Sequence, residues 1–124
     1  MSNAISYKQK AVHFTPEGHP DIPCRLNNLG ISFQTRFEHT GDLADISEAI
    51  SYKQKAVHLT PEGHADFPRH LNNLGKSFLC RFKRTEDVAD IFTLLSIDRQ
   101  GATSPSGPPS VRLELAIRWA RLSS

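Results

Sequence analysis

The sequence lacks the features that mark a membrane protein, a secreted protein or a nucleic-acid-binding protein. No run of apolar residues approaches the roughly 18 that a membrane-spanning helix needs. The first residues have neither the basic start nor the apolar stretch of a signal peptide. The net charge of +2 over 124 residues gives no case for a nucleic-acid partner, which would require a clustered basic face. We therefore expect neither a membrane nor a nucleic acid among the partners.

Cysteine is scarce as well. The two cysteines, Cys24 and Cys80, occupy positions that are not equivalent in the repeat described below, so we expect free thiols in a reducing compartment and a cytoplasmic protein. No Cys-x-x-Cys or His-Glu-x-x-His spacing is present. His19 and His64 follow Pro-Glu-Gly in predicted loops, where we interpret them as structural. We expect no metal ion and no other cofactor.

The most informative feature is an internal repeat. The nine residues from Ile5 to His13 recur letter for letter from Ile50 to His58, an offset of 45. When residues 4–46 are compared with residues 49–91, 31 of the 43 positions are identical and 12 differ. A fixed period of this length is typical of stacked structural units, each of which cannot bury its apolar side alone. The repeat therefore predicts an all-α array of antiparallel helix-turn-helix units.

Each period predicts a first-type helix and a second-type helix, and the chain begins with a helix of the second type. The predicted first-type helices span residues 22–38 and 67–84, and the predicted second-type helices span residues 1–14, 42–59 and 87–97. A stretch rich in Gly, Ser and Pro at residues 98–109 predicts a flexible linker. Residues 110–124 predict a C-terminal amphipathic helix.

The first-type helices show a continuous apolar side. Apolar residues at spacings of 3 and 4 fall on one side of a helix. In the first repeat they are Leu26, Leu29, Phe33 and Phe37, and the second-type helix contributes Ile46, Ala49, Ile50, Ala56, Val57 and Leu59. Gly30 and Gly75 lie inside first-type helices, where glycine costs about 1 kcal/mol relative to alanine. We therefore expect a neighbouring helix to approach closely at these glycines, with Ala49 and Ala56 on the partner helix.

Local signals fix the predicted helix ends. Gly41 is expected to take the left-handed conformation that ends the first-type helix, and Asp42 to cap the helix that follows. Pro61 ends the second-type helix, because proline cannot continue its hydrogen bonds. Phe78 and Phe82 are expected to pack in the core, and Tyr7 and Tyr52 between repeats.

The pattern Leu-x-x-Leu-Gly-x-x-Phe, found at Leu26–Phe33 and Leu71–Phe78, resembles the first-helix signature of tetratricopeptide repeats. Ala49, Ala56 and Pro61 follow with the spacing of that family's small residues and closing proline. Leucine replaces the usual tryptophan, and the period is 45 instead of about 34, as in the longer repeats of the kinesin-light-chain type. The Asn-Asn-Leu-Gly and Thr-Pro-Glu-Gly-His phrases resemble fungal tetratricopeptide arrays that carry a caspase-like CHAT peptidase domain. The resemblance implies a fragment of a right-handed helical solenoid.

The resemblance also implies that the first-type helices line a concave groove that binds a peptide or a helix of another protein. Beside the apolar stripe lies an adjoining face that would form this groove. Its residues are Asn27, Ile31, Gln34, Thr35, Arg69, Asn72, Lys76 and Leu79. The asparagines are expected to bond a peptide backbone, and Arg69 and Lys76 to attract a carboxylate. Asn72→Ala or Lys76→Glu should then weaken partner binding and leave the helix content unchanged.

Six of the 12 differences between the repeats fall on or beside this face. Selection for a different partner chemistry in each repeat predicts that pattern, and so does relaxed drift of an exposed surface. Cys24 and Cys80 have no oxyanion loop or acid placed around them, so we expect no enzymatic activity. Two alternatives stay open beside a non-catalytic scaffold: the truncated regulatory arm of a CHAT-type peptidase whose catalytic domain is absent, and a purely structural spacer. Because about two repeats are present and roughly three are usually needed, marginal stability or self-association through exposed repeat edges is also expected.

Overall fold

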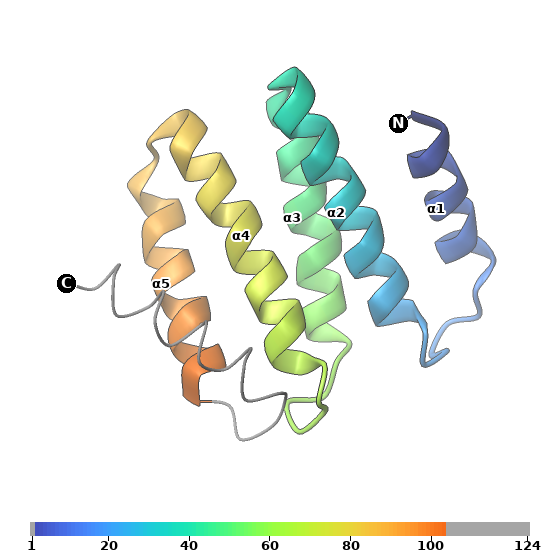
Figure 1. Ribbon diagram of the computed structural model, residues 1–124. Helices are drawn as coiled ribbons and strands as arrows, with labels where there is room; N and C mark the ends of the chain where they lie inside the picture. Colours follow the sequence, from blue (N-terminus) through green and yellow to red (C-terminus); the bar gives the residue numbers. More distant parts are fainter. Residues whose placement is uncertain (1, 104–124) are drawn as a thin grey trace. The chain divides into compact units, whose positions relative to one another are not determined.

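The computed structural model describes residues 2–103, which form five α-helices and no strand. The helices are α1 (Ser2–Phe14), α2 (Ile22–Thr40), α3 (Leu43–His58), α4 (Phe67–Thr85) and α5 (Val88–Thr103) (Figure 1). The chain divides into two compact units, Met1–Leu59 and Thr60–Ser124. The prediction of an all-α fold is confirmed for the described residues. None of the described helices is both long enough and apolar enough to cross a membrane.

The first four helices begin and end within two residues of the predicted positions, whereas α5 does not. It continues to Thr103, so residues 98–103 are helical where the sequence pattern predicted a linker. Gly101 is the weakest helix former in residues 98–103, and one glycine costs about 1 kcal/mol, which is too little to end a helix by itself. The rest of the predicted linker, residues 104–109, and the predicted helix 110–124 lie outside the described residues.

Proline and aspartate set the beginnings of the helices. α2 and α4 carry proline within their first two positions, where the missing amide hydrogen has no intrahelical partner to lose. Asp42 caps α3, since its Oδ1 accepts a hydrogen bond from the Ala44 amide at 3.0 Å. Asp87 accepts the equivalent bond from Ala89 at the start of α5, also at 3.0 Å. The predicted cap is therefore present in both repeats.

Left-handed residues end the first-type helices. Gly41 has φ of +73°, and its amide donates to the Phe37 carbonyl at 2.7 Å, as predicted. Glu86 occupies the equivalent position of the second repeat, with φ of +59° and the same bond to the Phe82 carbonyl. A side chain in this conformation is strained by roughly 1–2 kcal/mol, which glycine avoids. The surrounding turn therefore holds Glu86 in a conformation that its own side chain disfavours.

In the first unit, the core forms where α2 packs antiparallel to α3 (Figure 1). The four predicted apolar residues of α2 are all buried, and α3 covers them with a buried set of its own. The α3 set consists of Ile46, Ala49, Ile50 and Ala56. Leu59 is 51% exposed because α3 ends one residue before it, so its prediction as a core residue is wrong. α1 packs on α2 as well, through the buried Ile5, and does not contact α3.

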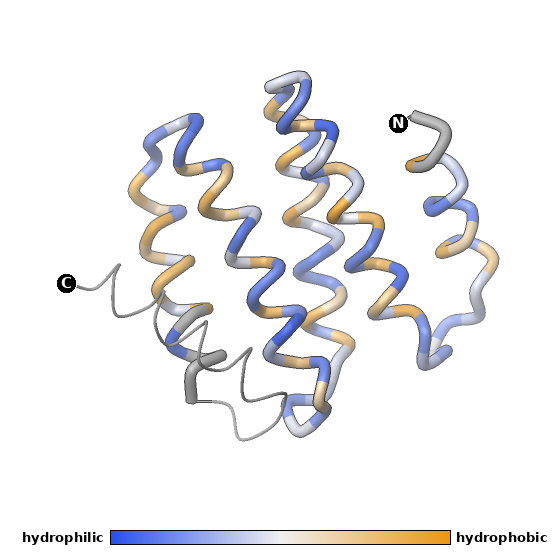
Figure 2. The backbone as a smooth tube through the Cα atoms, viewed as in Figure 1, coloured by the Kyte–Doolittle hydropathy of each residue, from blue (hydrophilic) through white to orange (hydrophobic). Residues whose placement is uncertain are grey.

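The second unit repeats this pairing with α4 and α5. Leu71, Leu74 and Phe78 are buried on α4, and Leu94 and Ile97 are buried on α5. Phe82, predicted as a core residue, is only half-buried. Apolar residues recur along the helices between hydrophilic stretches, as amphipathic helices require (Figure 2).

Gly30 allows α2 and α3 to approach closely, as the sequence predicted. A Cβ atom at this position would lie 2.6 Å from Lys53 Cγ and 3.0 Å from the carbonyl oxygen of Ala49. Both distances are shorter than ordinary van der Waals contact, which for carbon atoms is about 3.5–4.0 Å. The contact therefore involves Ala49, as expected, and also a lysine that the apolar pattern did not identify.

Candidate partner-binding faces of the first-type helices

On α2, the predicted groove residues differ in how far a partner could reach them. Ile31 and Thr35 are exposed, and the Thr35 hydroxyl donates to the Ile31 carbonyl at 2.9 Å. Gln34 is half-buried, and Asn27 is only 6% exposed. The exposed part of the predicted face on α2 is therefore small and uncharged, and consists of Ile31 and Thr35.

Gln34 holds a buried lysine of the neighbouring helix. Lys53 on α3 is 1% exposed, and its ammonium donates to Gln34 Oε1 at 2.6 Å. Gln34 also donates through Nε2 to Glu38 at 3.0 Å. A buried ammonium without hydrogen-bond acceptors is strongly unfavourable, so this contact stabilises the α2–α3 pair. We assign Gln34 to packing within the unit, in addition to any contact that it makes with a partner.

The two asparagines of the predicted groove are buried. Asn27 and Asn72 are each 6% exposed, so neither presents its amide to a peptide at the surface. With about 100° between successive residues, Asn27 lies only about 60° around the helix from Gly30, where α3 approaches. The apolar stripe alone did not reveal this, because it fixes the centre of the buried side and not its width. Asn72→Ala is consequently expected to change stability, and it is a poor probe of partner binding.

On α4, the exposed part of the predicted face is basic. Arg69 and Lys76 are exposed, and Leu79, one turn after Lys76, is half-buried. Lys83 continues the same line at a spacing of seven residues and is also exposed. Arg69 forms an ion pair with Asp66 at 3.3 Å. Lys76 and Lys83 form no ion pair among residues 2–103, and α4 itself contains no acidic residue.

We call Arg69, Lys76 and Lys83 the basic stripe of α4. At 1.5 Å per residue, they span about 21 Å of the helix. The equivalent positions of α2 hold Cys24, Ile31 and Glu38, so the first repeat has no such stripe. The change from Glu38 to Lys83 reverses a charge within two otherwise similar repeats. The stripe thus distinguishes the exposed face of α4 from that of α2.

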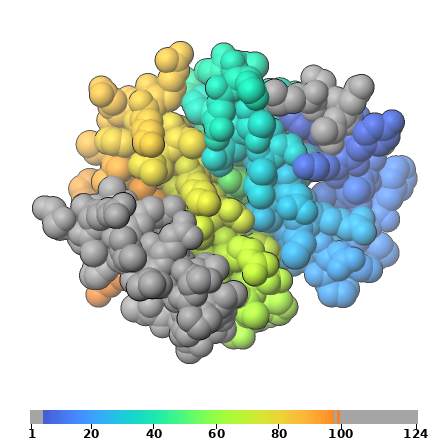
Figure 3. Space-filling model, in the orientation of Figure 1, coloured from blue at the N-terminus to red at the C-terminus, as the bar shows by residue number. Residues whose placement is uncertain are grey.

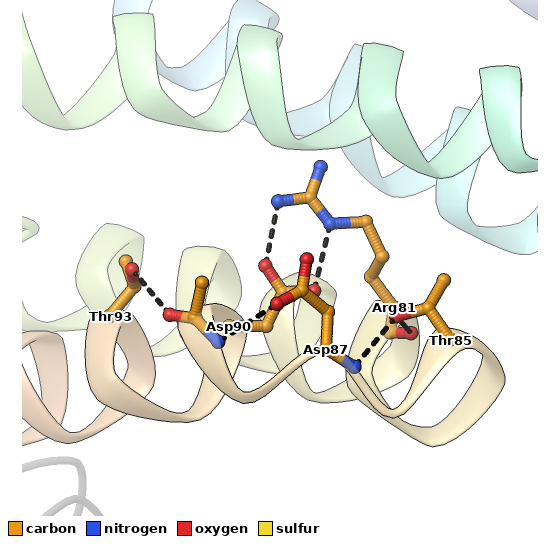
Figure 4. A network of polar contacts seen from close by, with 6 residues as sticks. Arg81, Thr85, Asp87, Asp90 and Thr93 are labelled. Atoms are coloured by element: carbon orange, nitrogen blue, oxygen red, sulfur yellow. Dashed lines mark hydrogen bonds and ion pairs between the residues drawn. The ribbon is translucent and has the colours of Figure 1, made fainter.

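Sequence reasoning missed the strongest polar contacts of both repeats, which are bidentate arginine–aspartate pairs. Arg36 donates to Asp45 at 2.7 and 3.0 Å, and Arg81 donates to Asp90 at the same distances (Figure 4). Both carboxylates are buried. The hydrogen bond to the aspartate raises the pKa of each arginine above its ordinary value, so each arginine stays charged. Each pair joins a first-type helix to the second-type helix that follows it.

Each of these arginines also lies over an aromatic ring one turn earlier. The Arg36 guanidinium is 5.2 Å from the centroid of Phe33, and that of Arg81 is 5.4 Å from Phe78. A cation at this distance from a ring centroid is attracted by the ring's quadrupole. The sequence does contain a signal that could have indicated these contacts, because the arginine, the aspartate and the phenylalanine are the same in both repeats. We interpret these residues as structural, which accounts for their being the same in both units.

Three of the histidines make hydrogen bonds within the fold. His19 and His64 each accept a hydrogen bond at Nδ1 from the amide two residues later, at 3.1 and 3.0 Å. His70 is buried on α4, with Nδ1 3.1 Å from the Thr60 hydroxyl. Burial lowers the pKa of His70 below its ordinary value, and the nearby Asp66 carboxylate offsets only part of that effect. Within residues 2–103, no group of three His, Cys, Asp or Glu side chains is placed to hold a metal ion.

Neither Cys24, which is exposed, nor Cys80, which is half-buried, forms a disulfide bond. Cys80 follows Leu79 on α4, so it lies beside the basic stripe.

Comparison of the chain with family models, with curated proteins and with solved structures found no match.

Proposed function

We propose that this chain is a fragment of a tetratricopeptide-like solenoid that binds a segment of another protein on the exposed faces of its first-type helices, without catalysis. The basic stripe of α4 would bind an acidic, partly apolar peptide. The observation that carries this proposal is the exposure of Lys76 and Lys83 without ion pairs among the described residues, on a helix that has no acidic residue.

The difference between the repeats supports this reading. The residues of the Arg–Asp pairs and of the Leu-x-x-Leu-Gly-x-x-Phe pattern are identical in the two repeats, whereas the exposed line on the first-type helix changes from Cys24, Ile31 and Glu38 to the basic stripe. A surface that served only to keep the protein in solution would not need three cations in one line. Oppositely charged side chains on a partner would be attracted to this line, and salt would weaken the attraction.

Charge alone gives a weak complex. An exposed ion pair contributes about 0.2–1 kcal/mol, so three pairs provide at most about 3 kcal/mol, or roughly a hundredfold in affinity. The remaining affinity must come from apolar contact, and the half-buried Leu79 lies one turn from Lys76. We therefore propose a partner segment in which acidic residues alternate with apolar residues.

The test is fluorescence anisotropy with a labelled peptide of repeated Leu-Glu-Glu triplets, beside a control peptide in which every Glu is Gln. The wild-type chain should bind the acidic peptide more tightly, and added salt should reduce the difference. Lys76→Glu should weaken binding by about three- to tenfold, since it removes one attraction and adds one repulsion. Lys55→Glu, at an exposed lysine of α3, makes the same change of charge away from α4 and should have little effect.

A reciprocal variant transplants the stripe. Replacing Ile31 and Glu38 of α2 by lysine, both at exposed positions, should increase binding of the acidic peptide. Equal binding of the two peptides, or equal effects of Lys76→Glu and Lys55→Glu, would contradict a specific role for the stripe. Failure of every variant and peptide to show binding would favour a structural spacer.

A further inference from the structure

The motif Thr-Pro-Glu-Gly-His occurs once in each unit, at Thr15–His19 and at Thr60–His64. A threonine followed by proline is the sequence that proline-directed protein kinases require at the residue they phosphorylate. The chain has one further Ser-Pro or Thr-Pro pair, Ser104–Pro105, which lies outside the described residues. Although the two motifs have the same sequence, their threonines differ in accessibility and in the side chain that faces the hydroxyl.

Thr15 directly follows α1, in the segment that leads to α2. It is half-buried, and residues 16–18 after it are exposed, so this segment forms part of the surface of the first unit (Figure 3). The Thr15 hydroxyl donates to the Ala11 carbonyl and accepts a hydrogen bond from Arg25 Nη1 at 2.9 Å. Arg25 lies in the first turn of α2, and its side chain is 43% exposed. The hydroxyl thus already contacts a guanidinium, the side-chain group that binds phosphate best.

Thr60 is placed differently. It is only 6% exposed, and its hydroxyl oxygen lies 3.1 Å from Nδ1 of the buried His70. Position 70 is the equivalent of position 25, so histidine stands here in place of the arginine of the first repeat. Burial lowers the pKa of His70, so its ring carries no charge at neutral pH. A kinase could reach Thr60 only after local opening of the fold, and no cation at position 70 would then hold a phosphate.

We propose that Thr15 is a phosphorylation site of a proline-directed protein kinase and that Arg25 binds the phosphate. In this reaction the Thr15 oxygen forms a bond to the γ-phosphorus of ATP, while the bond between that phosphorus and the β–γ bridging oxygen breaks. ADP leaves, and the hydroxyl proton passes to the kinase. The phosphothreonine carries a charge of about −1.5 to −2 at neutral pH.

Arg25 offsets the unfavourable effects of a phosphate at this position. The ester oxygen cannot donate to the Ala11 carbonyl, and negative charge is disfavoured beside the carboxyl end of α1. Arg25 is at present paired with Asp21 at 3.9 Å, where both side chains are largely exposed. A phosphate has more charge and more acceptor oxygens than a carboxylate, so it should replace Asp21 as the partner of Arg25. The modification would then place an ion pair between the end of α1 and the start of α2. The inference concerns the first unit alone and does not depend on the basic stripe of α4.

The first test is phosphorylation of the full chain by a purified mitogen-activated protein kinase with ATP, followed by trypsin digestion and mass spectrometry. Tryptic fragments 11–25 and 56–69 each contain a single hydroxyl-bearing residue, Thr15 and Thr60 respectively, so each site is read separately. Thr15 should be phosphorylated about tenfold faster than Thr60, or more, because the buried threonine reacts only after local opening. Pro16→Ala should remove most of the reaction at Thr15.

Synthetic peptides with the sequences of the two fragments provide the matched control. They lack the tertiary structure and share the Thr-Pro-Glu-Gly-His motif, so the kinase should phosphorylate them at similar rates. Preference for Thr15 in the chain but not in the peptides would support the proposal. Absence of phosphate at Thr15 of the chain, or equal rates at Thr15 and Thr60 of the chain, would overturn it.

The second test is titration of the phosphorylated chain by phosphorus NMR, which measures the pKa of the phosphothreonine. Arg25→Gln should raise this pKa by about 0.5 unit, because removal of a neighbouring cation favours the less charged form. Arg25→Lys keeps the charge and should retain most of the wild-type value. Because Arg25 is exposed, both variants should keep the wild-type circular dichroism spectrum. The same pKa in the wild type and in Arg25→Gln would refute Arg25 as the residue that binds the phosphate.

Discussion

Substitution of Gly30 distinguishes a close helix contact from an ordinary helical surface by the sign of its effect on stability. Alanine in place of glycine in an exposed helix interior stabilises by about 1 kcal/mol. At Gly30 the new Cβ would lie 2.6 Å from Lys53 Cγ and 3.0 Å from the Ala49 carbonyl oxygen. Lys53 is buried and hydrogen-bonded, and the carbonyl belongs to the backbone of α3, so neither atom can yield without moving a packed group.

Overpacking of this kind costs about 1–3 kcal/mol. After the gain in helix propensity is subtracted, Gly30→Ala should destabilise the protein by about 1 kcal/mol. Gly30→Val should cost about 2 kcal/mol or more, because valine carries two methyl groups beyond the Cβ of alanine and gains less in helix propensity than alanine does. Urea unfolding followed by circular dichroism measures both values from the shift in midpoint at constant slope.

Gly63 provides the matched control. A Cβ at this loop position would meet no atom within 4 Å, and its φ lies outside the left-handed range. Gly63→Ala should therefore leave stability unchanged or raise it by about 0.4–1 kcal/mol through the unfolded chain. If Gly30→Ala were to stabilise the protein as a surface glycine replacement does, the close approach of α2 and α3 would be refuted.

Three further predictions concern the second repeat. Glu86→Gly should stabilise by about 1 kcal/mol, because it relieves a left-handed side chain; an unchanged urea midpoint would contradict that conformation. Asp90→Asn should lower the free energy of unfolding by about 1–2 kcal/mol in the same assay, through loss of the charge-assisted bonds to Arg81, and an effect below about 0.3 kcal/mol would show that the pair contributes little. Because the pKa of His70 is lowered in the folded state, its contribution to stability is fully present above the ordinary pKa of about 6.5 and is lost as the pH falls below it, by at most about 1.4 kcal/mol per pH unit. His70→Gln should flatten stability measured between pH 7.5 and 5, and an unchanged slope would show that His70 titrates normally.

The sequence predicted the parts of the fold that depend on local periodicity and on repetition. Leu29 and Phe33 are buried as expected, Gly41 is left-handed, and Asp42 caps α3. These features follow from spacing along one helix or from the conformational freedom of one residue. The expected arrangement as a right-handed solenoid stays a prediction, since it concerns how successive repeats pack and not how each one forms.

The polar contacts were harder to predict, because they join residues on different helices. Arg36 and Asp45 are nine positions apart and meet only after the turn folds. A pattern of apolar residues predicts Lys53 at the surface, yet the lysine is buried. Gly30 leaves space for its side chain, and Gln34 accepts a hydrogen bond from its ammonium. Tyr7 was expected to pack, and it is exposed because identical sequence does not ensure identical neighbours. Comparison of the two repeats identifies the Arg–Asp pairs, whose residues are the same in both repeats, but it does not identify Gln34, which is leucine in the second repeat.

The predicted partner-binding face is in part retained. Ile31, Thr35, Arg69 and Lys76 are exposed, as a contact surface requires, while Asn27 and Asn72 are buried. Whether a residue beside the apolar stripe is buried depends on how closely the adjacent helix approaches, and the stripe itself does not specify that distance. Lys83, which completes the basic stripe, was not among the residues that the sequence predicted for this face.

The central claim is that α2 packs tightly against α3, the second-type helix that follows it. A nuclear Overhauser spectrum of the labelled chain tests it most directly. The account predicts cross-peaks between the rings of Phe33 and Tyr52, and between the α-protons of Gly30 and the Lys53 side chain. Absence of both sets in a spectrum that retains the helical signals of α2 and α3 would contradict it.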